Sequence, residues 1–142
     1  GYLVIPDALN DSQEVFNAAT IANRVMGAVN APSLMQRVIK RCVYENVNLE
    51  AYDRNRNLLY NGLRDLGFEC IKPEGAFYLF LKSPEADEKK FCASCKKYNI
   101  LVVPGSSFAC PGYVRISYCV SYGQIERSLP AFRKVAADYG LV

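Results

Sequence analysis

Apolar residues in the first part of the chain recur every three to four positions, which is the spacing of amphipathic helices. The helices predicted from this spacing span residues 11–26, 32–43 and 48–66. Asp11 with Glu14 resembles a capping pair, and Asn48 is a suitable N-cap for the third helix. Gly67 provides the left-handed residue that commonly ends a helix.

From residue 68 onward the pattern changes to short strand-like runs separated by turns and helices. The predicted strands span residues 68–72, 76–82, 100–103 and 113–120. A helix is predicted over residues 87–98, and a last one begins at Ser121, which forms a capping box with Gln124. Pro130 inside that last helix removes one backbone donor and is expected to bend it. This part of the chain predicts a helix-covered sheet.

The first apolar run, residues 2–5, is closed by Pro6 and is typical of a strand buried on both faces of a parallel sheet. No other strand of that type lies near it in the sequence, so we expect its sheet to be encoded upstream. We therefore divide the chain into residues 1–45, part of something larger, and residues 46–142, which could fold by themselves.

The composition is that of a folded protein, with 51% hydrophobic and 22% charged residues. The net charge of +3 is small and both signs are mixed, whereas a nucleic-acid-binding protein normally carries a basic stripe. We interpret the lysine doublets at 89–90 and 96–97 as the solvated face of a helix. No apolar run reaches the ~18 residues of a membrane span. We expect neither nucleic acid nor membrane as a partner.

The chain has no histidine, which excludes Ser-His-Asp and Cys-His chemistry and metal sites that need imidazole. Its six cysteines lie mostly among apolar neighbours and no secretion signal is visible, so we expect reduced thiols in a cytoplasmic protein. Cys92 and Cys95 have the spacing of a redox or zinc pair. Zinc needs about four ligands and no second pair is available, so we interpret both as structural and expect no metal site.

Arg115 is the strongest candidate for binding a ligand. Alternation along a strand puts it on one face together with Tyr113, Ser117 and Cys119. A guanidinium among Val, Ile and Tyr must reach an anion or water, because an unpaired buried charge is unfavourable. Its planar fork binds a carboxylate through two parallel hydrogen bonds. The alternative is an exposed arginine in a surface ion pair, and the strand alone does not decide between the two.

Two glycine-containing segments are candidates of lower specificity. Residues 104–108 could offer amides and hydroxyls to a phosphate, but the segment leads into a predicted strand and has no following lysine of the P-loop kind. We interpret it as a loop beside a ligand. Gly75 is expected to serve the turn between two strands, where the absence of Cβ is useful.

Taken in order, three segments resemble the carboxy-terminal signature of class I/II aminotransferases, which are fold-type I pyridoxal-phosphate enzymes. These segments are PEGAFYLF at 73–80, VVPGSSF at 102–108 and GYVRISY at 112–118, followed by the helix QIERSL at 124–129. The resemblance implies an α/β (α+β) fold, in which a short, mostly antiparallel sheet is covered by helices. It also implies that residues 1–45 are the tail end of the large cofactor-binding domain, with Gly1 and Tyr2 in one of its strands. Residues 46–142 would then be the small carboxy-terminal domain with the interdomain helix.

The activity implied by this resemblance is transfer of an amino group between an amino acid and a 2-oxo acid through pyridoxal 5'-phosphate. Arg115 matches the arginine that binds the substrate α-carboxylate, and the segments around Gly75 and Gly105 would line the mouth of the active site. The Schiff-base lysine and most cofactor contacts are expected upstream, so no catalytic, cofactor-binding or metal-binding residue is expected within this chain. The resemblance further implies a homodimer.

Other functions remain open at this point. A lyase of the C–S β-lyase type or an α-oxoamine synthase would use the same scaffold. A stand-alone amino-acid-binding domain of the ACT type would run βαββαβ, whereas residues 68–142 are predicted to run ββαββα. A small redox or metal protein would depend on Cys92 and Cys95. Which amino acid is the substrate is not indicated by these residues.

Overall fold

The computed structural model describes residues 2–27 and 30–142. Its chain divides into two compact units, Gly1–Asn46 and Val47–Val142. The first unit holds α1 (Ser12–Val25) and α2 (Ser33–Cys42). The elements of the second unit are α3 (Leu49–Asp65), β1 (Cys70–Ile71), β2 (Tyr78–Lys82), α4 (Glu88–Lys97), β3 (Val103–Pro104), the 3₁₀ helix η1 (Gly105–Phe108), β4 (Tyr113–Ser117) and α5 (Tyr122–Asp138). That residues 1–45 end a cofactor-binding domain stays a prediction.

Residues 2–5 form no strand, and the prediction of one was wrong for this structure. The side chains of Tyr2, Leu3 and Val4 are 94%, 73% and 71% exposed. A strand needs a neighbour that takes its backbone hydrogen bonds, and none of the described residues offers one. The predicted capping pair is also wrong, because Asp11 adopts φ 60° and its side chain makes no capping hydrogen bond. The predicted position of Gly1 in this strand lies outside the described residues.

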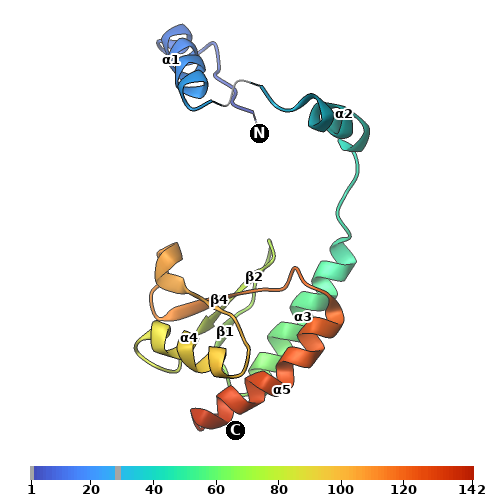
Figure 1. The fold of residues 1–142 in the computed structure, drawn as a ribbon, viewed down its shortest axis with the longest axis vertical. Coiled ribbons are helices and arrows are strands. Elements are labelled where there is room, and N and C mark those ends of the chain that lie inside the picture. Colours follow the sequence, from blue (N-terminus) through green and yellow to red (C-terminus); the bar gives the residue numbers. More distant parts are fainter. Residues whose placement is uncertain (1, 28–29) are drawn as a thin grey trace. The chain divides into compact units, whose positions relative to one another are not determined.

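The second unit is built on a four-stranded sheet in the order β1-β2-β4-β3 (Figure 1). Each neighbouring pair is antiparallel, and β2 with β4 forms the longest ladder, from Tyr78 opposite Ser117 to Lys82 opposite Tyr113. The predicted fold class, a short antiparallel sheet covered by helices, is confirmed. The strands are shorter than the sequence pattern predicts, most clearly β1, which keeps two of the five expected residues.

The core of the second unit lies between one face of this sheet and the helices. Leu79 and Leu81 of β2 alternate with half-buried residues, as Val114 and Ile116 do in β4, and these four point into the core. Helices α3 and α5 run side by side against it (Figure 1). The largest fully buried side chains are Tyr118, Phe91, Leu59, Leu63, Leu79, Leu81, Val114, Val135 and Cys95.

The ends of the helices follow the predicted capping residues. The Asn48 side chain accepts a hydrogen bond from the Ala51 amide at 3.0 Å, and the Ser121 side chain accepts one from the Gln124 amide at 3.3 Å. Gly67 adopts φ 81° directly after α3, where a residue with a side chain would be strained. The capping roles of Asn48, Gly67 and Ser121 are confirmed, whereas no bond of the described residues returns from the Gln124 side chain to Ser121 to complete the predicted capping box. None of the helices in the described residues has the length and apolar character needed to cross a membrane.

The chain leaves β4 at Ser117, earlier than predicted, because a buried asparagine takes the backbone carbonyls that follow. Asn55 on α3 is 7% exposed, and its Nδ2 donates to the carbonyl of Tyr118 at 3.1 Å and to that of Val120 at 2.7 Å. In a longer strand, these two carbonyls would accept hydrogen bonds from a neighbouring strand; here they accept them from the Asn55 side chain. Asn55 therefore fixes the connection between the central strand and α5.

We expect Asn55→Asp to destabilise the chain by about 3 kcal/mol, because a carboxylate cannot donate to either carbonyl and would place a charge in a buried position. The free energy of unfolding from urea titration measures this change. Asn61→Asp, the same substitution at an exposed position of α3, is the matched control. Equal stability of the two variants would contradict the role given to Asn55.

Candidate functional site

Arg115 lies at the centre of β4, one of the two inner strands of the sheet. Its Cα partners are Phe80 on β2 and Val103 on β3. Because Val114 and Ile116 point into the core, alternation turns Arg115 to the opposite face of the sheet. Two strands therefore fix its backbone, and its side chain is half-buried on the face that α3 and α5 leave uncovered.

Two aromatic rings hold the Arg115 guanidinium. Its Cζ lies 4.0 Å from the ring centroid of Tyr78 and 3.7 Å from that of Phe108. Tyr78 belongs to β2, whereas Phe108 ends η1, so the two rings come from segments 30 residues apart in the sequence. A guanidinium over an aromatic face gains about 0.5–2 kcal/mol per contact, more where water is excluded.

The hydrogen-bond donors of Arg115 remain available in this arrangement. Guanidinium N–H groups lie in the plane of the group, and an aromatic face cannot take up these in-plane donors as a hydrogen-bond acceptor oxygen does. Within the part of the chain that the structure describes, no carboxylate forms an ion pair with Arg115. The site thus offers a positively charged, planar fork that a carboxylate can approach edge-on.

Tyr78 is positioned by the turn that precedes β2. The Tyr118 hydroxyl donates to the Ala76 carbonyl at 2.9 Å, and Arg56 Nη1 donates to the Pro73 carbonyl at 3.0 Å. Burial raises the pKa of the Tyr118 hydroxyl, so it keeps the proton that it donates. The turn is therefore tied both to the end of β4 and to α3.

The expectation that Gly75 supplies the special backbone conformation of this turn was wrong. A Cβ built at Gly75 would meet nothing within 4 Å, and Gly75 has no left-handed φ. The left-handed residue is Ala76, with φ 58°. An alanine in this region is uncommon, and the bond from Tyr118 is the contact that holds its carbonyl in place.

Phe108 is positioned by a closed loop over residues 105–112. A Cβ at Gly105 would lie 2.2 Å from the Cys110 carbonyl oxygen and 2.6 Å from that of Tyr113, so only glycine fits there. The segment interpreted as a loop from sequence contains the 3₁₀ helix Gly105–Phe108. Its closure brings the Phe108 ring back over the strand that carries Arg115.

Glu88 joins the two ends of this loop. It is 8% exposed, and its carboxylate oxygens accept hydrogen bonds from the backbone amide of Ser106 at 3.3 Å and from that of Gly112 at 3.0 Å. Hydrogen bonding by Ser106, and then by the Gly112 amide, lowers the pKa of the Glu88 carboxyl. The lysine doublets of α4 are exposed, as predicted, whereas Glu88 on the same helix is buried.

The cysteines considered as a redox or zinc pair have raised thiol pKa values. Burial raises the pKa of the Cys95 thiol to about 12 and also raises that of Cys92, which disfavours the thiolate that redox chemistry or metal binding needs. All six cysteines are free. Among residues 2–27 and 30–142, no cluster of three or more His, Cys, Asp or Glu side chains could hold a metal ion.

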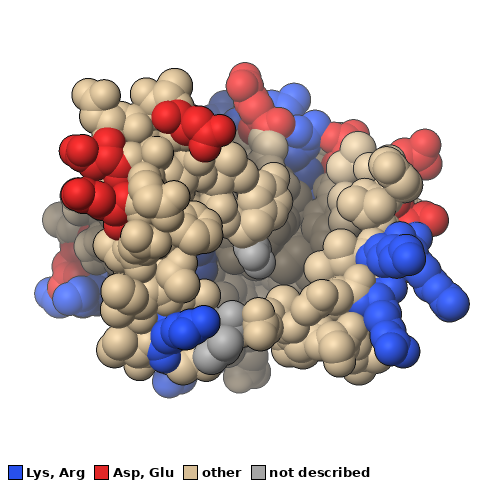
Figure 2. Space-filling view, turned by 90° about the horizontal axis from the view of Figure 1, so that it is seen from above, with Lys and Arg blue, Asp and Glu red and all other residues tan. Residues whose placement is uncertain are grey.

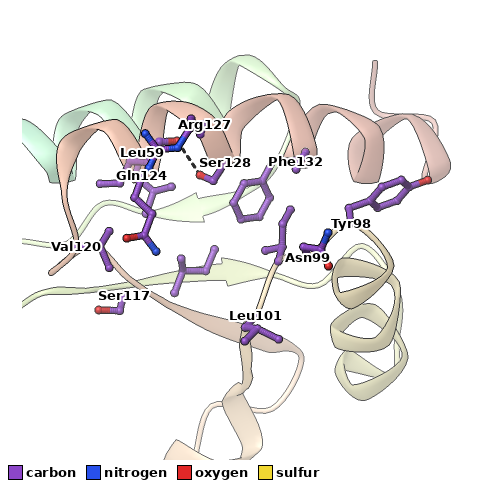
Figure 3. A pocket seen from close by; sticks show the side chains of 14 residues that line it. Leu59, Tyr98, Asn99, Leu101, Ser117, Val120, Gln124, Arg127, Ser128 and Phe132 are labelled. Atoms are coloured by element: carbon purple, nitrogen blue, oxygen red, sulfur yellow. Dashed lines mark hydrogen bonds between the residues drawn. The ribbon is translucent and has the colours of Figure 1, made fainter.

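A separate pocket of about 460 Å³ lies between α5, α3 and the segment 98–101 (Figure 3). Gln124 and Phe132 of α5 line it from one side, and Leu101 from the other. Its lining is mainly apolar, and Arg115 is not part of it. The charged site on the sheet and this pocket are therefore distinct places.

Charges are mixed on the surface. On the face that Figure 2 draws, Lys and Arg side chains occur beside Asp and Glu and are separated by uncharged surface. The mixture on this face agrees with the small net charge of +3.

Comparison with known proteins decides the family. A sequence profile described as aminotransferase class I and II matches residues 1–132. The chain belongs to the class I and II aminotransferase family. A crystal structure of an aminotransferase from Eubacterium rectale is 45% identical to this aminotransferase chain, with a TM-score of 0.89 over 98% of the chain and 35% of that protein.

One further relative is named for its amino acid class, and another was solved with a ligand. Aromatic-amino-acid aminotransferase 2 of Thermococcus litoralis is 40% identical over 64% of this chain and 25% of its own length. A Thermus thermophilus aspartate aminotransferase solved with maleate is 38% identical, with a TM-score of 0.59 over 61% of this chain and 23% of that one. This aminotransferase chain spans about a quarter of the length of the curated relatives that it matches first.

Sequence reasoning identified Arg115 but missed the residues around it. Tyr78 and Phe108 lie within the family segments, yet nothing in the sequence showed that both rings contact one guanidinium. Glu88, which directly precedes the lysine doublet at 89–90, was given no role from the sequence. One signal was available: helical spacing puts Glu88 on the same face of α4 as Phe91 and Cys95, so it is an acidic residue on the apolar face of the helix.

We expect Gly105→Ala to destabilise the aminotransferase chain by about 3 kcal/mol, because the new methyl group would collide with two backbone carbonyls. Gly75→Ala, where the added methyl meets open space, is expected to change stability by less than about 0.5 kcal/mol. Thermal unfolding of the two variants and the parent chain measures both values. A Gly105→Ala chain as stable as the Gly75→Ala chain would show that the loop is not closed as described.

Proposed function

We propose that this chain is the carboxy-terminal part of a pyridoxal-phosphate-dependent aminotransferase, in which Arg115 binds the α-carboxylate of the amino acid and 2-oxo acid substrates. The observation that carries the proposal is a half-buried guanidinium between two aromatic rings, with accessible donors and no carboxylate of the described residues beside it. Membership in the aminotransferase family supplies a ligand that fits, since every amino acid presents a carboxylate.

In this proposal Arg115 orients the substrate and takes no part in proton transfer. Two parallel hydrogen bonds to the carboxylate fix both the position and the rotation of the group. The rings of Tyr78 and Phe108 keep the guanidinium in one plane before the substrate arrives, so less conformational freedom is lost on binding. Orientation of this kind lowers the barrier of the chemical step by holding the substrate Cα in a productive position.

The cofactor is proposed to be held by sequence that precedes this chain in the longer enzyme. The residues present here do not fit it: all eight lysines are exposed, and none lies in a segment that resembles the Schiff-base motif. The exposed apolar side chains of α1 and α2 support the same proposal, because they provide a surface for a larger domain to cover. The homodimer implied by the family resemblance belongs to this proposal as well.

A lyase on the same scaffold would also need Arg115, since both reactions begin by binding an amino acid. The relatives named above are all aminotransferases, which favours amino-group transfer. The two reactions differ in their products, because a β-lyase releases ammonia whereas an aminotransferase passes the amino group to a 2-oxo acid. An assay of the longer enzyme for both products separates them.

We expect Arg115→Lys in the longer enzyme to lower kcat/KM roughly 30- to 1000-fold, which corresponds to about 2–4 kcal/mol of lost charge-assisted hydrogen bonding. A lysine keeps the charge but cannot form the bidentate pair. Arg133→Lys, an exposed position on α5, is the matched control and should leave kcat/KM unchanged. Steady-state kinetics with aspartate and with an aromatic amino acid give the values. Unchanged kinetics in Arg115→Lys would remove this residue from the site.

We expect the purified 142-residue chain to show no transamination when pyridoxal phosphate, an amino acid and a 2-oxo acid are added, because none of its lysines is placed to hold the cofactor. A coupled assay for the newly formed amino acid measures this. The longer enzyme at the same concentration is the positive control. Turnover by the short chain above the rate of free cofactor would overturn the proposal that the catalytic lysine lies elsewhere.

A further inference from the structure

We propose that Glu88 is a positioning residue for Arg115, acting through the loop that carries Phe108. The inference rests on the proposed function, because it assigns Glu88 to carboxylate binding by Arg115. Glu88 sits at the first turn of α4, on a different element from both rings and from the strand. Its effect on the guanidinium therefore has to pass through the loop.

The first step is the closure of the loop by one carboxylate. One oxygen of Glu88 accepts from the Ser106 amide and the other from the Gly112 amide, so the side chain spans the two ends of residues 106–112. Phe108 lies between these two bonds in the sequence. A shift at either end would move its ring away from Arg115, whose Cζ is 3.7 Å from the ring centroid.

The second step is the requirement for a carboxylate. Both partners of Glu88 are backbone N–H donors, and an ionised carboxylate is the side chain that offers two acceptor oxygens. A glutamine of the same shape would direct its NH₂ group at one of these donors and lose that bond. An exposed residue could exchange these bonds for bonds to water. Glu88 is buried, so the loss of one acceptor oxygen would leave an amide without a partner.

The third step is the difference between the two rings that hold Arg115. Tyr78 is part of β2 and is paired directly with β4, so the sheet itself fixes its position. Phe108 lies outside the sheet, in a segment closed by Gly105 and by Glu88. The contact made by Phe108 is the one that the loop controls, and Glu88 is the side chain that controls the loop.

A double-mutant cycle in the longer enzyme tests this route. We expect Glu88→Gln and Phe108→Leu each to raise KM for the amino acid about five- to tenfold with kcat changed less than about twofold, because binding of the carboxylate is loosened in ground state and transition state alike. The double variant should match the larger single effect, since both changes remove one contact. Additive effects, or a loss of kcat with KM unchanged, would overturn the proposal.

Asp87→Asn is the matched control. It removes the same charge from the adjacent residue of α4, and asparagine retains the helix cap that Asp87 forms with the Lys89 amide. We expect its KM to equal that of the parent enzyme. A KM raised as much by Asp87→Asn as by Glu88→Gln would show a general charge effect and would sink the proposal. Thermal unfolding of each variant identifies any loss of folding.

A second measurement uses the 142-residue chain and needs no cofactor. The NMR resonance of the Arg115 Nε–H is sensitive to the ring current of Phe108. We expect Glu88→Gln and Phe108→Leu to shift this resonance in the same direction and Asp87→Asn to leave it in place. A resonance that moves in Phe108→Leu but stays in Glu88→Gln would refute the coupling. If both variants shift the Arg115 resonance but the longer enzyme shows no aminotransferase activity, the proposed function is refuted and the coupling between Glu88 and Phe108 stands.

The same spectra give a pH dependence. The pKa of Glu88 lies below the ordinary value of 4.5. Its carboxylate is therefore ionised above pH 4.5 and keeps both hydrogen bonds to the loop. These bonds are lost as the pH falls through the lowered pKa of Glu88. The carboxyl of Asp87 beside it is removed in Asp87→Asn, and burial raises the pKa of the Cys92 thiol one turn further along α4. In Asp87→Asn, the Ser106 and Gly112 amide resonances should therefore shift below pH 4.5. Absence of that shift would contradict the bonds from Glu88.

Discussion

A positive charge held between two rings, without an acidic neighbour among the described residues, is the constraint on which this site depends. A half-buried arginine is normally paired, because removing a charge from water is unfavourable. Here Tyr78 and Phe108 replace part of the lost hydration through their negative faces, but they cannot accept the in-plane hydrogen bonds. The in-plane donors therefore stay available to an anion, as the proposed role of Arg115 requires.

Three buried polar side chains keep the geometry around this charge. Asn55 fixes the chain after the central strand, Tyr118 fixes the turn before Tyr78, and Glu88 fixes the loop of Phe108. Each of the three bonds backbone groups that no regular element satisfies. The apolar core supports the sheet from one face, whereas these polar contacts shape the segments that border the other face. The same small unit thus uses apolar packing under the sheet and buried polar contacts for the segments around Arg115.

The sequence was sufficient to predict the elements that depend on neighbouring residues alone. Apolar spacing and the capping residues Asn48, Gly67 and Ser121 predicted the helices of the second unit, and the ordered family segments identified Arg115. It was insufficient wherever distant segments decide the outcome. The strand expected at residues 2–5 has no partner here, the left-handed residue of the turn is Ala76 and not Gly75, and the burial of Glu88 depends on a loop 18 residues away. Such contacts follow from strand order, which hydrophobic periodicity does not encode.

Among the described residues of the first unit, no side chain is buried, and its helices display Phe16, Ile21, Val25, Leu34 and Ile39 to solvent. Apolar surface of this extent attracts other exposed apolar surface. Residues 47–142, in contrast, bury an apolar core of their own. Taken by itself, the first unit is therefore the more aggregation-prone of the two, and a covering domain of the kind proposed above would remove that risk.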